Sequence, residues 1–126
     1  MTTLTPDQTG KLSALLTERE RQLAAEIETA RQATRQRDGQ RAHEVVDRKE
    51  DATDEASIEV AQAETERDIA ELKAVQAARL RLESGLYGQC IDCEEPIALQ
   101  RLLAQPAAAR CAACQTGHEE RLAHRH

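Results

Sequence analysis

All four cysteines of the chain lie in two Cys-x-x-Cys pairs in its C-terminal third. The pairs are Cys90 with Cys93 and Cys111 with Cys114, and seventeen residues separate them. Each pair presents two thiolates from a tight turn, and the intervening segment is long enough to fold the second pair back onto the first. A single pair would leave a redox dithiol open, whereas two pairs favour one Zn²⁺. We predict a structural site, because four thiolates leave no coordination position for a water or substrate.

Outside the cysteines the sequence offers no arrangement that is typical of catalysis. It has no paired nucleophile and base, no Gly-rich phosphate loop and no aromatic platform on which bases could stack. We therefore predict that the chain is not an enzyme. The four histidines are interpreted as ordinary surface residues: His43, His118, His124 and His126.

The composition favours exposed helices over a compact globule. Aromatic residues make up 1% and charged residues 32% of the 126 residues, so a compact part would need a metal as a staple. No apolar run approaches the roughly 20 residues of a membrane span, and the N-terminus lacks a signal-peptide pattern. Reduced cysteines and a cytoplasmic location are therefore expected.

The net charge of −6 is concentrated between residues 41 and 66, which hold nine acidic and three basic residues. Such a block repels phosphates and argues against direct nucleic-acid binding there. No sequence-specific DNA binding is expected.

Two long helices are predicted, at about 6–36 and 54–84. Thr5, Pro6 and Gln8 indicate a cap, a first helical residue and a capping-box partner. Asp51 or Thr53 can cap the second helix. Its end is predicted at Ser84-Gly85, with Gly85 as a left-handed cap. The apolar seams are Leu12, Leu15, Leu16, Leu23, Ile27 and Ala30 in the first helix, and Ile58, Ala61, Ile69, Leu72, Val75, Leu80 and Leu82 in the second.

Narrow seams on two helices of equal length predict an all-α fold, with an antiparallel coiled-coil hairpin over residues 1–85. Its acidic tip is expected at about 40–56. Residues 86–126 are predicted to form a zinc-finger domain, with a short helical or irregular piece at 97–104 and a tail helix from Glu119 to about His124.

Opposite charges are matched across the predicted arms. Folding at the tip would bring Arg31 and Arg35 near Glu64 and Glu59, where they either pair or remain solvated. The tip carboxylates likewise allow two interpretations. They either cap the helix and keep it soluble, or they are delivered into a basic or metal-containing cavity of a partner.

The chain resembles the DksA/TraR family of bacterial transcription regulators. The match includes Tyr87-Gly88, all four cysteines, Arg101-Leu102, Pro106 and Gln115, and at the tip Asp51-x-x-Asp54-x-Ala56. Glu94 departs from the pattern, because the family usually has Gly after the second cysteine. This departure is expected to cost local strain and no ligand.

The resemblance implies that the hairpin enters the secondary channel of RNA polymerase. Asp51 and Asp54 would then lie near the active centre, with Ala56 packed against polymerase and the zinc domain at the channel rim. The effect would be an altered stability of open promoter complexes. The resemblance leaves the alarmone ppGpp open as a further partner, and Arg67, Lys73 and Arg79 are its candidate ligands.

Two other interpretations compete with this one. The chain could be a zinc-stapled coiled-coil adaptor for a different protein, with a tip that is merely solvated. The hairpin could also dimerise, whereas a monomer is expected for the transcription factor.

Overall fold

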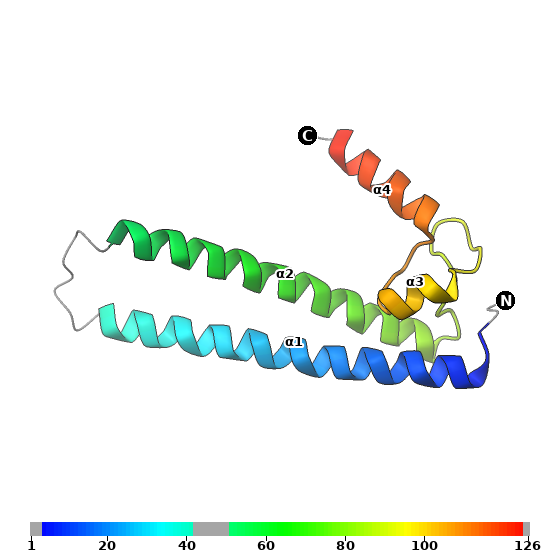
Figure 1. Cartoon of the computed structure of the whole chain (residues 1–126), viewed down its shortest axis with the longest axis horizontal. Helices are drawn as coiled ribbons and strands as arrows, with labels where there is room; N and C mark the ends of the chain where they lie inside the picture. The colour runs from blue at the N-terminus through cyan, green and yellow to red at the C-terminus, as the bar shows by residue number, and fades with distance from the viewer. Residues whose placement is uncertain (1–3, 42–50, 125–126) are drawn as a thin grey trace. The chain divides into compact units, whose positions relative to one another are not determined.

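The computed structural model describes residues 4–41 and 51–124, and these form four helices. The order is α1 (Pro6–Arg41), α2 (Asp51–Glu83), α3 (Leu99–Ala104) and α4 (Ala112–His124) (Figure 1). Within this part of the chain the extended backbone amounts to an isolated antiparallel bridge between Gln89 and Pro96. The predicted all-α class, with a two-helix hairpin, a small cysteine-containing part and a C-terminal helix, is confirmed.

The chain packs as two compact units. One unit contains Met1–Glu20 and Ala74–His126, and the other contains Arg21–Lys73. Each unit therefore includes a segment of α1 and a segment of α2, which run antiparallel (Figure 1). The domain boundary that the sequence suggests at residues 85/86 stays a prediction.

The start of α1 is fixed by the capping box that the sequence predicts. The backbone N–H of Gln8 donates to Thr5 Oγ1 at 3.1 Å, and the backbone N–H of Thr5 donates to Gln8 Oε1 at 3.0 Å. Two backbone donors at the helix start, which have no partner within the helix, are thus satisfied reciprocally. Pro6 follows as the first helical residue, where its missing N–H costs nothing.

Both long helices begin or end differently from the sequence prediction. α1 continues to Arg41 and includes Gly39, so its predicted end at residue 36 is too early. A glycine inside a helix costs only about 1 kcal/mol, and good helix formers such as Gln36 and Arg37 precede it. α2 begins at Asp51, so Asp51 is a helical residue and the predicted start at residue 54 is too late. Residues 42–50 of the predicted tip lie outside the described residues.

The end of α2 is a Schellman motif built around Gly85. Gly85 has φ of +75°, the backbone N–H of Leu86 donates to Arg81 O at 2.8 Å, and that of Gly85 donates to Leu82 O at 3.3 Å. Glycine adopts this left-handed conformation without the steric cost that a Cβ brings. The predicted C-cap is therefore confirmed, and it turns the chain out of the helix toward the first cysteine pair.

The buried apolar side chains follow the predicted seams with two exceptions. In the first unit they include Leu12, Leu16, Val75 and Ala78, and in the second Leu23 and Ile27. Leu15 is 38% exposed and Leu80 is 63% exposed, so both were wrongly assigned to the core. Leu80 comes five residues after Val75, which turns it about 140° away from that side of the helix. Ala78, at a three-residue step from Val75, takes the buried position instead.

Of the two alternatives for the charges across the arms, pairing or solvation, the described part of the second unit shows no pairs of Arg31 or Arg35 with Glu59 or Glu64. Arg35 instead lies 3.9 Å from Glu28 on its own helix, and both side chains are exposed. In the first unit, Arg79 of α2 does pair with Glu20 of α1. None of the helices in the described ranges combines the length and apolar character that a membrane span needs.

Candidate metal centre

The two cysteine pairs are held by different kinds of local structure. Cys90 and Cys93 lie in the turn between α2 and α3, whereas Cys111 immediately precedes α4 and Cys114 lies in its first turn. The predicted tail helix therefore starts seven residues too late, because α4 begins at Ala112 and not at Glu119. The backbone N–H of Gln115 donates to Cys111 O at 2.9 Å, so the second cysteine pair is also the beginning of the helix. Gly117 is accommodated inside that helix.

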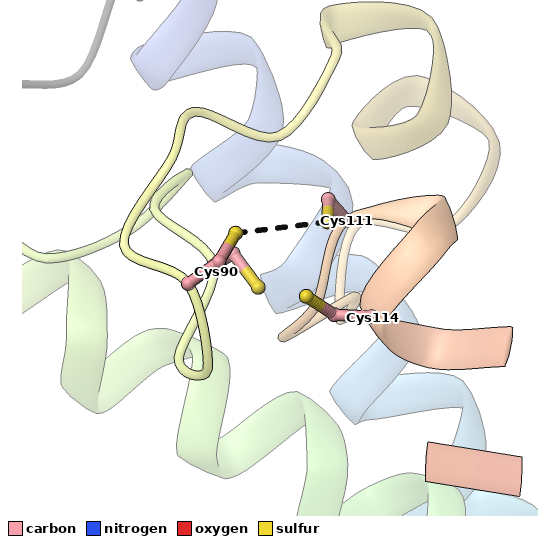
Figure 2. A group of neighbouring side chains, drawn as sticks. Cys90, Cys111 and Cys114 are labelled. Carbon is pink, nitrogen blue, oxygen red and sulfur yellow. Dashed lines mark hydrogen bonds between the residues drawn. The ribbon is translucent and has the colours of Figure 1, made fainter. Parts of the chain in front are cut away.

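The four thiols converge on one point, as their spacing predicts. All four Sγ atoms lie within 4.8 Å of one another, and Figure 2 shows Cys90 facing Cys111 and Cys114 across the site. The Sγ atoms of Cys93 and Cys111 are 3.8 Å apart. Sulfurs at a Zn–S distance of about 2.3 Å in a tetrahedron are separated by about 3.8 Å. The donor set and its spacing therefore fit one four-coordinate Zn²⁺.

Backbone hydrogen bonds shape the first cysteine turn. The backbone N–H of Glu94 donates to Cys90 O at 3.0 Å, and that of Cys90 donates to Glu95 O at 2.8 Å. Closing this turn places Glu94 at φ of +66°, the left-handed region that a side chain disfavours. The strain expected from Glu94 is therefore present, and it falls on a residue whose side chain is exposed.

Replacing Glu94 by glycine is expected to stabilise this turn. The substitution removes a left-handed strain of about 1–2 kcal/mol and adds an unfolded-state entropy cost of about 0.5–1 kcal/mol, for a net gain of up to about 1.5 kcal/mol. Because folding and metal binding are coupled, a competition titration with a chelating dye should show tighter zinc binding.

Glu95→Gly is the matched control for this substitution. Glu95 is also exposed, but its φ is not positive, so glycine brings only the entropy cost and should weaken zinc binding. Equal effects of the two substitutions would contradict the strain at Glu94.

An arginine network ties the first cysteine turn to the segment before the second pair. Arg110 Nε donates to Asp92 Oδ2 at 2.7 Å, and Arg101 Nε donates to Arg110 O at 2.9 Å. The backbone N–H of Ile91 donates to Ala109 O at 2.9 Å. These bonds link positions 9 to 18 residues apart and fix the second pair opposite the first. The resemblance includes Arg101, but no local pattern in the sequence identifies the roles of Arg110 and Asp92.

A small apolar core packs next to the cysteine site. Tyr87 is 4% exposed and its hydroxyl donates to Pro106 O at 2.7 Å. Burial raises the pKa of Tyr87 to about 12, so the phenol stays neutral and remains a donor. Gly88, at φ of +86°, accepts a bond from the backbone N–H of Ile97 at 2.7 Å. Ile97, which precedes α3, and Leu102 within α3 complete this core, at 3% and 0% exposure.

Electrostatics in the site favour a bound cation. Burial alone would raise the pKa of Cys90, but the backbone N–H groups of Cys93, Cys111 and Asp92 together lower it to about 6. The pKa of Cys114 is raised to about 12, first by the thiol of Cys111 and then by the other two cysteines. Four adjacent thiols cannot all ionise without a compensating charge. Zn²⁺ supplies that charge, and its binding therefore releases protons.

The tip residues that the sequence singled out are separate from this centre. Asp51 is the first residue of α2, Asp54 lies in its first turn, and Ala56 follows with an exposed side chain. The side chains of Asp51 and Asp54 lie outside the described part of the structure. Their role at a tip is still a prediction.

The comparisons with known proteins agree with this architecture. Residues 85–120 match the prokaryotic dksA/traR C4-type zinc finger. RNA polymerase-binding transcription factor DksA of Caulobacter vibrioides, in two strains, is 35% identical over 78 residues, which are 62% of this chain and 53% of that protein. The chain thus spans about half the length of the curated relatives it matches. The structure of transcription factor DksA2 from Pseudomonas aeruginosa matches with a TM-score of 0.75 and 29% identity, over 96% of this chain and 88% of that one.

A dksA/traR zinc finger, four converging thiols and a helical scaffold shared with DksA2 all occur in one sequence. Residues 85–120 thus form a zinc finger of the dksA/traR type that takes one structural Zn²⁺, and the chain as a whole is similar to the DksA proteins.

Proposed function

We propose that this chain is a bacterial transcription regulator that binds RNA polymerase and inserts the tip of its helical hairpin into the secondary channel. It acts in the cytoplasm, without catalysis of its own and without reading DNA sequence. The observation that carries the proposal is the combination of a dksA/traR zinc finger with an Asp51-x-x-Asp54-x-Ala56 sequence at the start of α2. The relatives, which are named as an RNA polymerase-binding transcription factor and as a transcription factor, support it.

The tip carries the activity in this proposal. Carboxylates in the first turn of a helix are stabilised by the positive end of the helix dipole. This interaction favours the helical conformation at the start of α2. Asp51 and Asp54 would present negative charge near the polymerase active centre, and exposed Ala56 would allow close contact with polymerase there. The charge alters the stability of open promoter complexes, and the zinc domain holds the factor at the channel rim.

Asp54→Asn is expected to abolish most of the effect on open complexes while leaving the factor bound. The substitution removes one charge and preserves side-chain size. Affinity for core polymerase should therefore stay within about tenfold of wild type, or ~1.4 kcal/mol. The measurement is open-complex half-life at a ribosomal promoter, together with competition against a cleavage factor for core polymerase.

Glu55→Gln is the matched control, because Glu55 is an exposed carboxylate next to Asp54 but outside the Asp-x-x-Asp-x-Ala pattern. It should retain the wild-type effect. Wild-type activity of Asp54→Asn in both assays would refute the proposed role of the tip.

The same assays, run with and without ppGpp, decide whether this alarmone takes part. Of its candidate ligands, Arg79 is already paired with Glu20, whereas Arg67 and Lys73 lie on the exposed surface of α2. A pull-down that recovers another protein and no polymerase subunits would favour the adaptor. Light scattering at the monomer mass of 14.0 kDa would exclude the dimer.

A further inference from the structure

The second unit contains a groove with an arginine-rich wall. It has a volume of about 670 Å³, is open to solvent, and lies between the last turns of α1 and the facing turns of α2. Arg31, Arg35 and Arg37 line it, against a single carboxylate from Glu66. The α2 side of the groove lies within the acidic stretch of residues 41–66, so the arginines of α1 are a local exception to the negative charge of this part of the chain.

The groove exists because the apolar seam of α1 changes to small residues. Leu23 and Ile27 are buried, but the residues that follow along the groove have side chains too short to fill the space between the helices. The small side chains that line it are Ala30, Ala33, Thr34, Ala61 and Thr65. The hydroxyls of Thr34 and Thr65 donate to carbonyls of their own helices at 3.0 and 2.9 Å, so they do not bridge the gap.

Among the residues that the structure describes, Arg35 and Arg37 make only long contacts. Arg35 lies at 3.9 Å from Glu28, which is a long and exposed pair, and Arg37 donates to Thr34 Oγ1 at 3.3 Å. Arg31 and Arg35 are one helical turn apart and therefore lie on the same side of α1. Guanidinium groups in this arrangement match the oxygens of carboxylates or phosphates.

The shape of the groove selects between these two kinds of ligand. Small-molecule sites enclose most of the surface of their ligand and usually contain aromatic side chains, whereas this groove is open and has none. An open groove along two helices, with cations spaced along one wall, suits a length of peptide that carries several carboxylates.

We propose that this arginine groove binds an acidic peptide segment of a protein partner. The peptide segment belongs to RNA polymerase, a step that rests on the proposed function. The arginines would then position the distal hairpin, separately from the effect of the tip on open complexes.

The first test uses the isolated, zinc-loaded chain and a short fluorescein-labelled poly-glutamate peptide, with fluorescence anisotropy as the readout. Binding should weaken with added salt, because exposed charges are screened over about 10 Å at 0.1 M. The double variant Arg31→Gln/Arg35→Gln should bind about three- to thirtyfold more weakly, as expected for two exposed charge pairs. Both side chains are exposed, so helix content by circular dichroism should not change.

The matched control is Lys11→Gln/Arg21→Gln, which removes the same charge from exposed positions outside the groove and should bind like wild type. Equal binding by wild type and the groove variant, or no binding by either, overturns the proposal. Inorganic triphosphate is the alternative probe, and a site that takes triphosphate but not the peptide also overturns it.

The second test measures the affinity of the same variants for core RNA polymerase. Weaker binding by the groove variant alone identifies polymerase as the partner. If wild type binds the peptide but not polymerase, the groove is supported and the proposed function fails. If wild type binds polymerase and the groove variant binds equally well, the proposed function stands and polymerase is excluded as the partner of the groove.

Discussion

Removing zinc is expected to unfold residues 86–124 while part of the helical hairpin persists. The buried side chains of this segment are Tyr87, Cys90, Ile97 and Leu102. Each large apolar one contributes about 1.5–3 kcal/mol, whereas ordering the backbone costs about 1–2 kcal/mol per residue. In small zinc-binding peptides near neutral pH, the bound metal contributes about 10–16 kcal/mol. A contribution of this size is needed to offset the entropy cost of ordering the segment.

Far-UV circular dichroism and amide hydrogen exchange, before and after chelation, measure this loss. Protection should disappear from residues 86–124, and part of the helical signal should remain from α1 and α2. Cys114→Ser should reproduce the unfolding without a chelator, and added zinc should restore only the wild-type protein. Full helicity and a cooperative thermal transition after zinc removal would show that the segment is stable without its metal.

Leu102→Ala is expected to produce the largest effect of a single apolar truncation in the zinc unit. Leu102 is 0% exposed on a helix of six residues, so its loss leaves a cavity that few neighbours can fill. Such truncations cost about 2–5 kcal/mol. Because folding and metal binding are coupled, this cost should appear as an apparent zinc affinity that is lowered about thirtyfold or more.

The adjacent residue provides the control. Leu103 has the same side chain on the same helix but is 39% exposed, so Leu103→Ala should change stability by no more than about 1 kcal/mol. A chelator-competition titration of both variants gives the comparison. Similar affinities of the two variants would mean that Leu102 does not support the site as its burial indicates.

The parts of the fold that the sequence predicts well are those determined by neighbouring residues. The capping box at Thr5 and Gln8 and the left-handed Gly85 depend on spacings of three to five residues, which are visible in the chain. The convergence of the cysteines is also predictable, because the chemistry of a four-thiolate metal site dictates it.

The parts that the sequence predicts poorly depend on tertiary contacts or on small free-energy differences between helical and non-helical backbone. The predicted end of the first helix at residue 36 and the predicted start of the tail helix at Glu119 both exclude a nearby glycine, yet Gly39 and Gly117 are tolerated inside helices. Leu80 has the residue type of a core position but the wrong angle on the helix. The link from Arg110 to Asp92 joins two charged residues eighteen positions apart, and nothing local marks them as partners.

The start of α4 within the second cysteine pair has a mechanical consequence. α4 has no fully buried side chain among its described residues, and its half-buried residues, such as Cys114, Gln115 and His118, lie in its first two turns. Its fixed point is Cys114, one thiolate of the metal site, with the hydrogen bond to Cys111 O beside it. The helix is thus anchored at its N-terminal end, and a bound zinc ion would hold that end in place. A distance measured to a probe near the C-terminal end of α4 would report metal occupancy, because a small rotation about the anchored end becomes a large displacement at the other end of the helix.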